Sequence, residues 1–175
     1  MKRVHGTKGI PLVECINHYI GKYRVRWDIQ LLENDESEEK NGVTFLETEI
    51  ILKRKPTIYD VKKAVYEGVN KMVDEDIISG FVWNDMSVWL SSENQFNYKA
   101  AYDLCVQTNG KNLPVVFKFG STETPIYHKF ETQEELCDFY TNAMRYISDT
   151  LSTGWTMKDA VVWSSYEECL KGLTK

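Results

Sequence analysis

The first third of the chain alternates between apolar and polar residues, which is the pattern of a strand with one buried face. Every second position of residues 23–31 is apolar: Tyr23, Val25, Trp27, Ile29 and Leu31. Residues 43–54 alternate in the same way. We predict that the two segments form an antiparallel β-hairpin. A shorter strand is predicted within residues 12–20, and residues 1–11 are predicted to be an extended arm that need not be well ordered.

Residues 34–42 join the two predicted strands and contain four carboxylates. A calcium loop of the EF-hand type needs oxygen ligands at alternate positions, a central glycine and a terminal glutamate, and the spacing here does not match. We therefore predict a solvated hairpin loop that closes on Asn41-Gly42.

Helical periodicity begins after Pro56. Thr57 is the predicted N-cap, with Asp60 three residues later. The apolar residues at helical spacing are Ile58, Val61, Val65, Val69, Met72 and Val73. They predict an amphipathic helix that ends between Ile77 and Gly80.

A tight turn follows this helix. Residues 81–83 and 87–90 are predicted to pair as a short hairpin that reverses at Asn84-Asp85, because Asn and Asp tolerate the positive φ of a two-residue turn.

The next helix is predicted to start at a capping box made by Ser92 and Gln95, and to run to about Gln107. Asn109-Gly110 ends it. Its predicted buried stripe is Phe96, Ala100, Leu104 and Cys105.

Two more strands are predicted at residues 113–119 and 126–130. Thr132 and Glu135 form a second capping box, which opens a strongly amphipathic helix. Its apolar face is Leu136, Phe139, Tyr140, Ala143, Met144, Ile147 and Leu151. Gly154 is predicted to break the chain.

The last segment has a further predicted cap at Thr156, with Asp159 three residues later. Two interpretations stay open for it. It is either one helix to about Leu170, or a short strand at residues 160–163 followed by a helix capped at Ser164 or Ser165.

Together these elements predict an α+β fold: an N-terminal antiparallel β-hairpin, a long helix, and a mixed unit of short antiparallel strands with two to three amphipathic helices. We predict an N-terminal β-hairpin region at residues 1–55 and an α+β domain at residues 56–175. One continuous domain is the alternative, because no linker rich in Pro, Gly or Ser divides the 175 residues.

The composition and charge of the chain limit the kinds of molecule that we expect it to bind. The net charge of -5 argues against a general nucleic-acid binder, which needs a basic surface. No apolar run approaches the ~20 residues of a membrane span, and the N-terminus does not resemble a signal peptide. The four cysteines are far apart and form no CxxC pair, which favours reduced thiols in a cytosolic protein.

No catalytic motif is present in the sequence. Phosphate-binding glycine loops and the GxSxG signature are missing. Cys15 and His18 have a spacing that suits two zinc ligands, but a structural zinc needs four. A Cys-His nucleophilic pair stays open, since such partners meet only in the fold. We predict a protein that is not an enzyme and has no metal, cofactor or catalytic residue.

Aromatic residues are the remaining candidates for function. We predict a partner-binding surface from Trp83, Trp89, Tyr98 and Tyr102. Tyr98 and Tyr102 are four residues apart and fall away from the predicted buried stripe, so we expect both to be exposed. For Trp83 and Trp89, core packing is favoured.

Residues 78–99, ISGFVWNDMSVWLSSENQFNYK, and residues 130–136, FETQEEL, resemble a tail-associated domain family of unknown function found in bacteriophages and prophages, including those of gut Bacteroidales. The resemblance covers residues 56–155 and carries no catalytic residues. It implies a structural or assembly protein that contacts other phage proteins or its own copies. It also implies synthesis in the cytoplasm of a bacterial host, with entry into the virion left open.

Two alternatives to this role stay open. One is a carbohydrate-binding or sugar-processing accessory protein that uses Trp83, Trp89 and Tyr98. The other is a small enzyme whose site is assembled from distant residues in a deep polar pocket.

Overall fold

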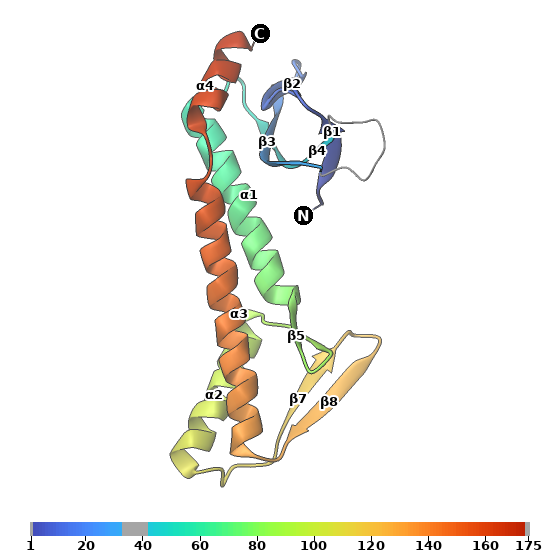
Figure 1. Cartoon of the computed structure of the whole chain (residues 1–175), viewed down its shortest axis with the longest axis vertical. Coiled ribbons are helices and arrows are strands. Elements are labelled where there is room, and N and C mark those ends of the chain that lie inside the picture. Colours follow the sequence, from blue (N-terminus) through green and yellow to red (C-terminus); the bar gives the residue numbers. More distant parts are fainter. Residues whose placement is uncertain (1, 33–41, 174–175) are drawn as a thin grey trace. The chain divides into compact units, whose positions relative to one another are not determined.

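The computed structural model describes residues 2–32 and 42–173. Its strands are β1 (Val4–Thr7), β2 (Val13–Asn17), β3 (Lys22–Leu31), β4 (Gly42–Ile51), β5 (Phe81–Trp83), β6 (Met86–Val88), β7 (Val115–Gly120) and β8 (Pro125–Phe130). Its helices are α1 (Ile58–Ser79), α2 (Ser92–Thr108), α3 (Gln133–Asp159) and α4 (Trp163–Gly172). The α+β class is confirmed (Figure 1). The predicted acidic loop lies outside the described residues, except for Gly42.

Contacts within the chain define two compact units. Unit 1 comprises Met1–Met72 and Gly154–Lys175, and unit 2 comprises Val73–Thr153. The division falls within α1 and α3. The predicted boundary between residues 55 and 56 lies inside unit 1 and stays a prediction.

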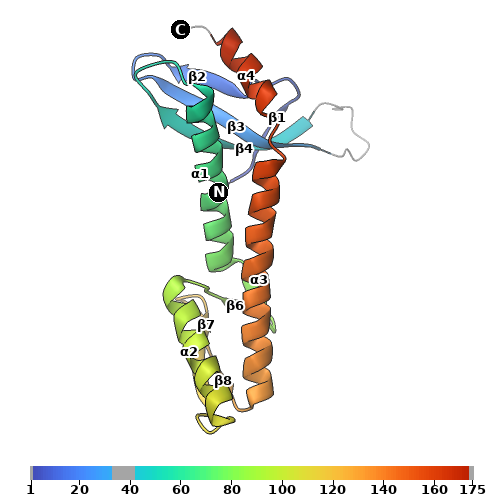
Figure 2. The same cartoon turned by 90° about the vertical axis from the view of Figure 1, so that its left-hand side faces the viewer.

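Unit 1 is built on an antiparallel sheet with the strand order β1-β4-β3-β2. The predicted hairpin is confirmed as β3 and β4, in which Trp27 pairs with Leu46. The predicted arm is partly wrong, because residues 4–7 form β1 and pair with β4. Figure 2 shows α4 beside this sheet, where the Cys169 thiol donates to the Val13 carbonyl.

The predicted alternation of buried and exposed residues along β3 ends at a β-bulge that follows Trp27. Tyr23, Val25 and Trp27 are buried as expected. The register then shifts between Trp27 and Gln30, and Asp28 adopts a left-handed backbone with φ 50°. A bulge adds a residue to one strand and turns the following side chains. Ile29 and Leu31 are therefore exposed, which corrects the prediction that they share the buried face.

The second face of the sheet carries ion pairs across neighbouring strands. Arg24 lies 3.2 Å from Glu47 and 3.3 Å from Glu49, on the adjacent strand. Arg26 is almost fully buried, and its guanidinium donates to Glu14 at 2.6 Å and to the Pro11 carbonyl at 2.7 Å. These bonds offset the cost of burying its charge.

The apolar face of the sheet packs against α1 within unit 1. At Gly68 of α1, an added Cβ would lie 2.6 Å from the Trp27 ring, so only glycine fits there. The Trp27 indole N–H donates to the Thr48 hydroxyl at 3.0 Å. The close approach of α1 therefore fixes the Trp27 side chain.

The turns of unit 2 follow the sequence prediction. Asn84 and Asp85 form the β5–β6 turn with φ of 47° and 60°. Asn109, with φ 49°, caps the end of α2. The predicted strands correspond to β7 and β8, which pair with each other. Half of the capping box predicted at the start of α3 is confirmed, since the Glu135 N–H donates to the Thr132 hydroxyl at 3.2 Å. The Glu135 carboxylate contacts His128.

Two predicted helix boundaries are wrong. The N-cap of α2 is Ser91, whose hydroxyl accepts from the Asn94 N–H, and not Ser92. Gly154 does not break the chain, because α3 runs through it to Asp159. A glycine costs a helix only about 1 kcal/mol, and Gly154 is buried on the apolar face.

The C-terminal segment follows neither predicted interpretation. Because α3 continues to Asp159, Thr156 lies inside that helix and does not cap a new one. The helix α4 begins at Trp163, with Val162 as an N-cap that makes no side-chain hydrogen bond. Neither Ser164 nor Ser165 is its cap.

The start of α1 is the strongest predicted cap. The Asp60 carboxylate accepts from the Thr57 N–H at 2.8 Å and from Arg54 at 2.6 and 2.9 Å. Hydrogen bonds from Arg54 hold the pKa of Asp60 well below its ordinary value. The ionised carboxylate is therefore part of the folded helix end.

We predict that Asp60→Asn lowers the free energy of unfolding at pH 7 by about 1 kcal/mol. In the wild type, a carboxyl pKa lowered by folding adds stability that is present above the unfolded pKa of about 3.9 and is lost as the pH falls below it. Urea unfolding between pH 2 and 7 measures this. The variant should show a shallower acid loss, and an unchanged acid slope would contradict the assignment.

The control is Glu67→Gln, which removes an exposed carboxylate farther along the same helix. It should change stability by less than about 0.5 kcal/mol at either pH.

Candidate functional site

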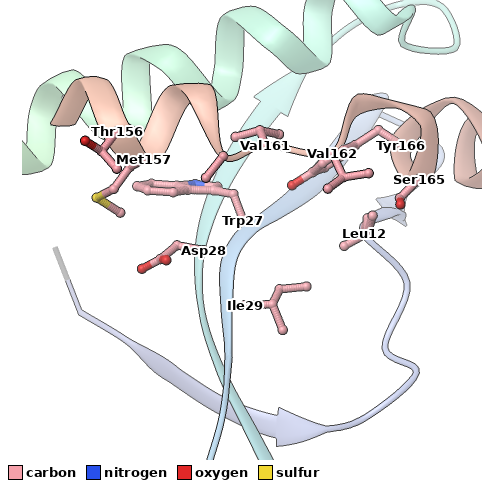
Figure 3. Close-up of a pocket in the computed structure, with 11 residues that line it drawn as sticks. Leu12, Trp27, Asp28, Ile29, Thr156, Met157, Val161, Val162, Ser165 and Tyr166 are labelled. Carbon is pink, nitrogen blue, oxygen red and sulfur yellow. The ribbon is translucent and has the colours of Figure 1, made fainter. Parts of the chain in front are cut away.

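A pocket of about 430 Å³ opens in unit 1 beside the β3 bulge (Figure 3). The Trp27 ring is part of its wall, together with Asp28 and Ile29 of β3 and the residues that connect α3 to α4. Most of its wall is apolar, contributed by Leu12, Ile29, Met157, Ala160, Val161 and Val162.

Asp28 and Tyr166, two of the polar residues that line this pocket, already have partners. Asp28 is ion-paired with Arg3, which also donates to the Asp28 carbonyl at 3.0 Å. The Tyr166 hydroxyl donates to the Arg26 carbonyl at 2.8 Å, and burial raises its pKa. Asp28 is the single carboxylate in the lining among the described residues. The pocket therefore suits an apolar group better than it suits acid-base chemistry.

Two of the four predicted site residues are buried in unit 2. Trp83 is 5% exposed, and its indole N–H donates to the Asp138 carboxylate at 3.0 Å. Tyr98 is 3% exposed and packs on Phe117 with ring centres 4.7 Å apart. Burial raises the pKa of Tyr98 to about 12. The expectation that Tyr98 is exposed is wrong, and neither ring lies open at the surface of unit 2.

The error follows from the face on which α2 packs. Its two fully buried residues are Tyr98 and Cys105, whereas Phe96 is 71% exposed and Leu104 is 48% exposed. The predicted stripe is therefore wrong except at Cys105. Apolar and aromatic residues lie on both sides of this helix, so their spacing alone does not decide which side is buried.

Tyr102 and Trp89 remain accessible. Tyr102 is half-buried and stacks on Tyr140 of α3, with ring centres 4.4 Å apart and 20° between the planes. Trp89 is 50% exposed, which corrects the expectation that it packs in the core. It lies beside a groove of about 380 Å³ between the β5–β6 and β7–β8 turns. Their role in partner binding stays a prediction.

A histidine and a carboxylate meet in unit 2, which the sequence did not indicate. His128 Nε2 lies 2.9 Å from Glu135 Oε1, and the imidazole stacks on Phe119. Neither residue lines the Trp27 pocket or the Trp89 groove. The pair links β8 to the start of α3.

The Cys15 thiol lies 3.4 Å from His18 Nδ1, so the two side chains are as close together as their spacing in the sequence suggested. Over residues 2–32 and 42–173, no three His, Cys, Asp or Glu side chains gather in a way that suits a metal ion. Within the same residues, no helix has both the length and the apolar character needed to cross a membrane.

No protein-family model, curated protein or solved structure matches the chain.

We predict that oxidation by N-bromosuccinimide distinguishes the two tryptophans of the β5–β6 region. Trp89 should react at least about ten times faster than Trp83, because the reagent reaches a buried ring only through local unfolding. Peptide mapping by mass spectrometry measures both rates in one sample. Buried Trp27 is the internal reference. Equal rates at Trp83 and Trp89 would show that the two rings are not placed as described.

Proposed function

We propose that this protein is a protein-protein interaction module that acts without catalysis. The setting suggested by the sequence resemblance is a phage or prophage tail, in which the module serves structure or assembly. Its partners are other phage proteins or further copies of this chain.

The observation that carries this proposal is the exposed apolar face of α2. Phe96, Ala100 and Leu104 follow one another at intervals of four residues, so they form one stripe on the helix. We call it the Phe96 face. Phe96 is more exposed than any other phenylalanine of the chain. Fully burying a phenylalanine side chain stabilises a complex by about 1.5–3 kcal/mol.

The residues around the Phe96 face suit the rim of an interface. Lys99 and Asp103 lie beside it and pair at 2.8 Å, and both are exposed in part. Interfaces typically place aromatic anchors at the centre and charged residues at the edge.

The same residues support self-association in particular. In an antiparallel pair of α2 helices related by a two-fold axis near Ala100, Phe96 of one copy meets Leu104 of the other. The small Ala100 side chain lets the two backbones approach. Lys99 of each copy then lies near Asp103 of the other, which adds opposite charges across the interface.

The carbohydrate alternative has lost two of its three rings, because Trp83 and Tyr98 are buried. It depends on Trp89.

We predict that Phe96→Glu weakens association with a partner or with a second copy at least about tenfold, because it places a charge at the centre of the face. Light scattering across a dilution series measures self-association, and co-purification with tail components measures binding to other phage proteins. The stability of the isolated chain should change by less than about 0.5 kcal/mol, since Phe96 is exposed.

Tyr127→Glu is the matched control, because Tyr127 is an exposed aromatic residue on β8 in the same unit. It should leave association unchanged. A strictly monomeric chain that is absent from tail particles would contradict the proposal, as would a Phe96→Glu variant that associates like the wild type.

A further inference from the structure

The groove beside Trp89 is built by two hairpin turns of unit 2. Asp85 and Ser87 come from the β5–β6 hairpin, and Ser121 and Thr124 come from the β7–β8 turn. Its volume of about 380 Å³ is within the range of small-ligand sites.

The Trp89 backbone is fixed while its ring remains open to solvent. Val88 and Leu90 on either side are fully buried. The Trp89 carbonyl accepts from the Asn94 side chain at 2.9 Å, and the Leu90 N–H donates to the Ile78 carbonyl at 3.0 Å. Half of the Trp89 side chain stays exposed in spite of these anchors. The ring is therefore an exposed flat surface carried by an anchored backbone.

Short polar side chains surround this ring. The Ser121 and Thr124 hydroxyls lie 2.8 Å apart, and Ser121 also accepts from the Thr124 N–H at 3.0 Å. Asp85 is exposed and held in a left-handed turn, so its position depends on the hairpin. Short side chains on tight turns lose little conformational freedom when they bind a ligand.

We propose that this groove binds a neutral carbohydrate. One sugar ring stacks its C–H face on Trp89, because the negative face of an aromatic ring attracts the weakly positive C–H groups. The Asp85 carboxylate and the hydroxyls of Ser87 and Thr124 bond the hydroxyl groups at the edge of the sugar. A small number of well-placed polar groups beside an aromatic wall is the usual composition of a small-ligand site.

The negative charge of the groove argues against nucleic acids, whose bases are also flat rings. Nucleic acids bind chiefly through cations that contact their phosphates. Among the described residues, the lining holds a carboxylate and neither lysine nor arginine. A phosphate or sulfate group placed here would be repelled by Asp85, whereas an uncharged sugar would not.

The first test is a glycan array probed with the full chain, followed by calorimetric titration of the best neutral oligosaccharide. The wild type should bind, and Trp89→Ala should weaken binding at least about tenfold, as the loss of a stacking ring typically does. Asp85→Asn keeps a residue that tolerates the left-handed turn and removes the charge. It should weaken binding about three- to tenfold through the loss of a charge-assisted hydrogen bond.

Tyr59→Ala is the control, because it removes an exposed aromatic ring that neither lines the groove nor belongs to the Phe96 face. It should bind the oligosaccharide as the wild type does, and near-ultraviolet circular dichroism checks that each variant is folded. The proposal is overturned if the wild type binds no neutral glycan, if it prefers anionic ones, or if Trp89→Ala and Asp85→Asn both bind normally.

These results are independent of the interaction module proposed for the Phe96 face. A chain that associates through Phe96 but binds no neutral glycan would overturn the carbohydrate site alone.

Discussion

Unit 2 depends on the packing of one phenylalanine of α3. Phe139 is fully buried, and its ring lies against rings from β5, α2, β7 and β8. These partners are Phe81, Trp83, Tyr98, Phe117, Phe119 and Phe130. Because Tyr98 must reach Phe139, α2 turns one side inward and leaves Phe96 on the other. The same packing of Trp83 and Phe119 holds the two hairpins whose turns form the Trp89 groove.

The two proposed binding surfaces are thus consequences of the core. Phe96 lies on the side of α2 opposite buried Tyr98, and Trp89 lies between the buried residues Val88 and Leu90. Their exposure therefore does not depend on a missing contact within unit 2. An exposed ring on a well-anchored element loses little conformational entropy on binding. A small loss of conformational entropy on binding favours both a protein interface and a sugar site. It is the physical basis of both proposals.

The sequence predicted what local interactions determine. The cap at Thr57 and Asp60, the turn at Asn84-Asp85 and the hydrogen bond from the Glu135 N–H to the Thr132 hydroxyl are all formed by residues three or fewer positions apart. The predictions from sequence were wrong where contacts between residues far apart in the chain determine the structure. The alternation of apolar and polar residues along β3 could not reveal the bulge at Asp28. The Asp28 carbonyl accepts a hydrogen bond from Arg3, which is far away in the sequence and directly precedes β1. The spacing of apolar residues in α2 could not show that tyrosine faces inward and phenylalanine outward, because only the Phe139 core selects between the two sides.

The same limit applies to the predicted site residues, because contacts with distant residues determine which of them are exposed. Trp89 and Tyr102 are accessible, as a surface role requires, but Trp83 and Tyr98 belong to the core. The apolar stripe predicted for α2 wrongly placed Phe96 in the core. The Trp27 pocket was not predicted at all, since it needs the bulge and the connection between α3 and α4.

The central claim is that α2 packs with Tyr98 inward and presents Phe96 to a partner. Solvent paramagnetic relaxation of the Phe96 and Tyr98 ring protons, measured at low protein concentration and again in the assembled state, tests it most directly. We expect Tyr98 to be protected under both conditions, and Phe96 to be strongly relaxed in the dilute protein and protected on assembly. Protection of Phe96 in the dilute protein, or its continued exposure after assembly, would contradict the account.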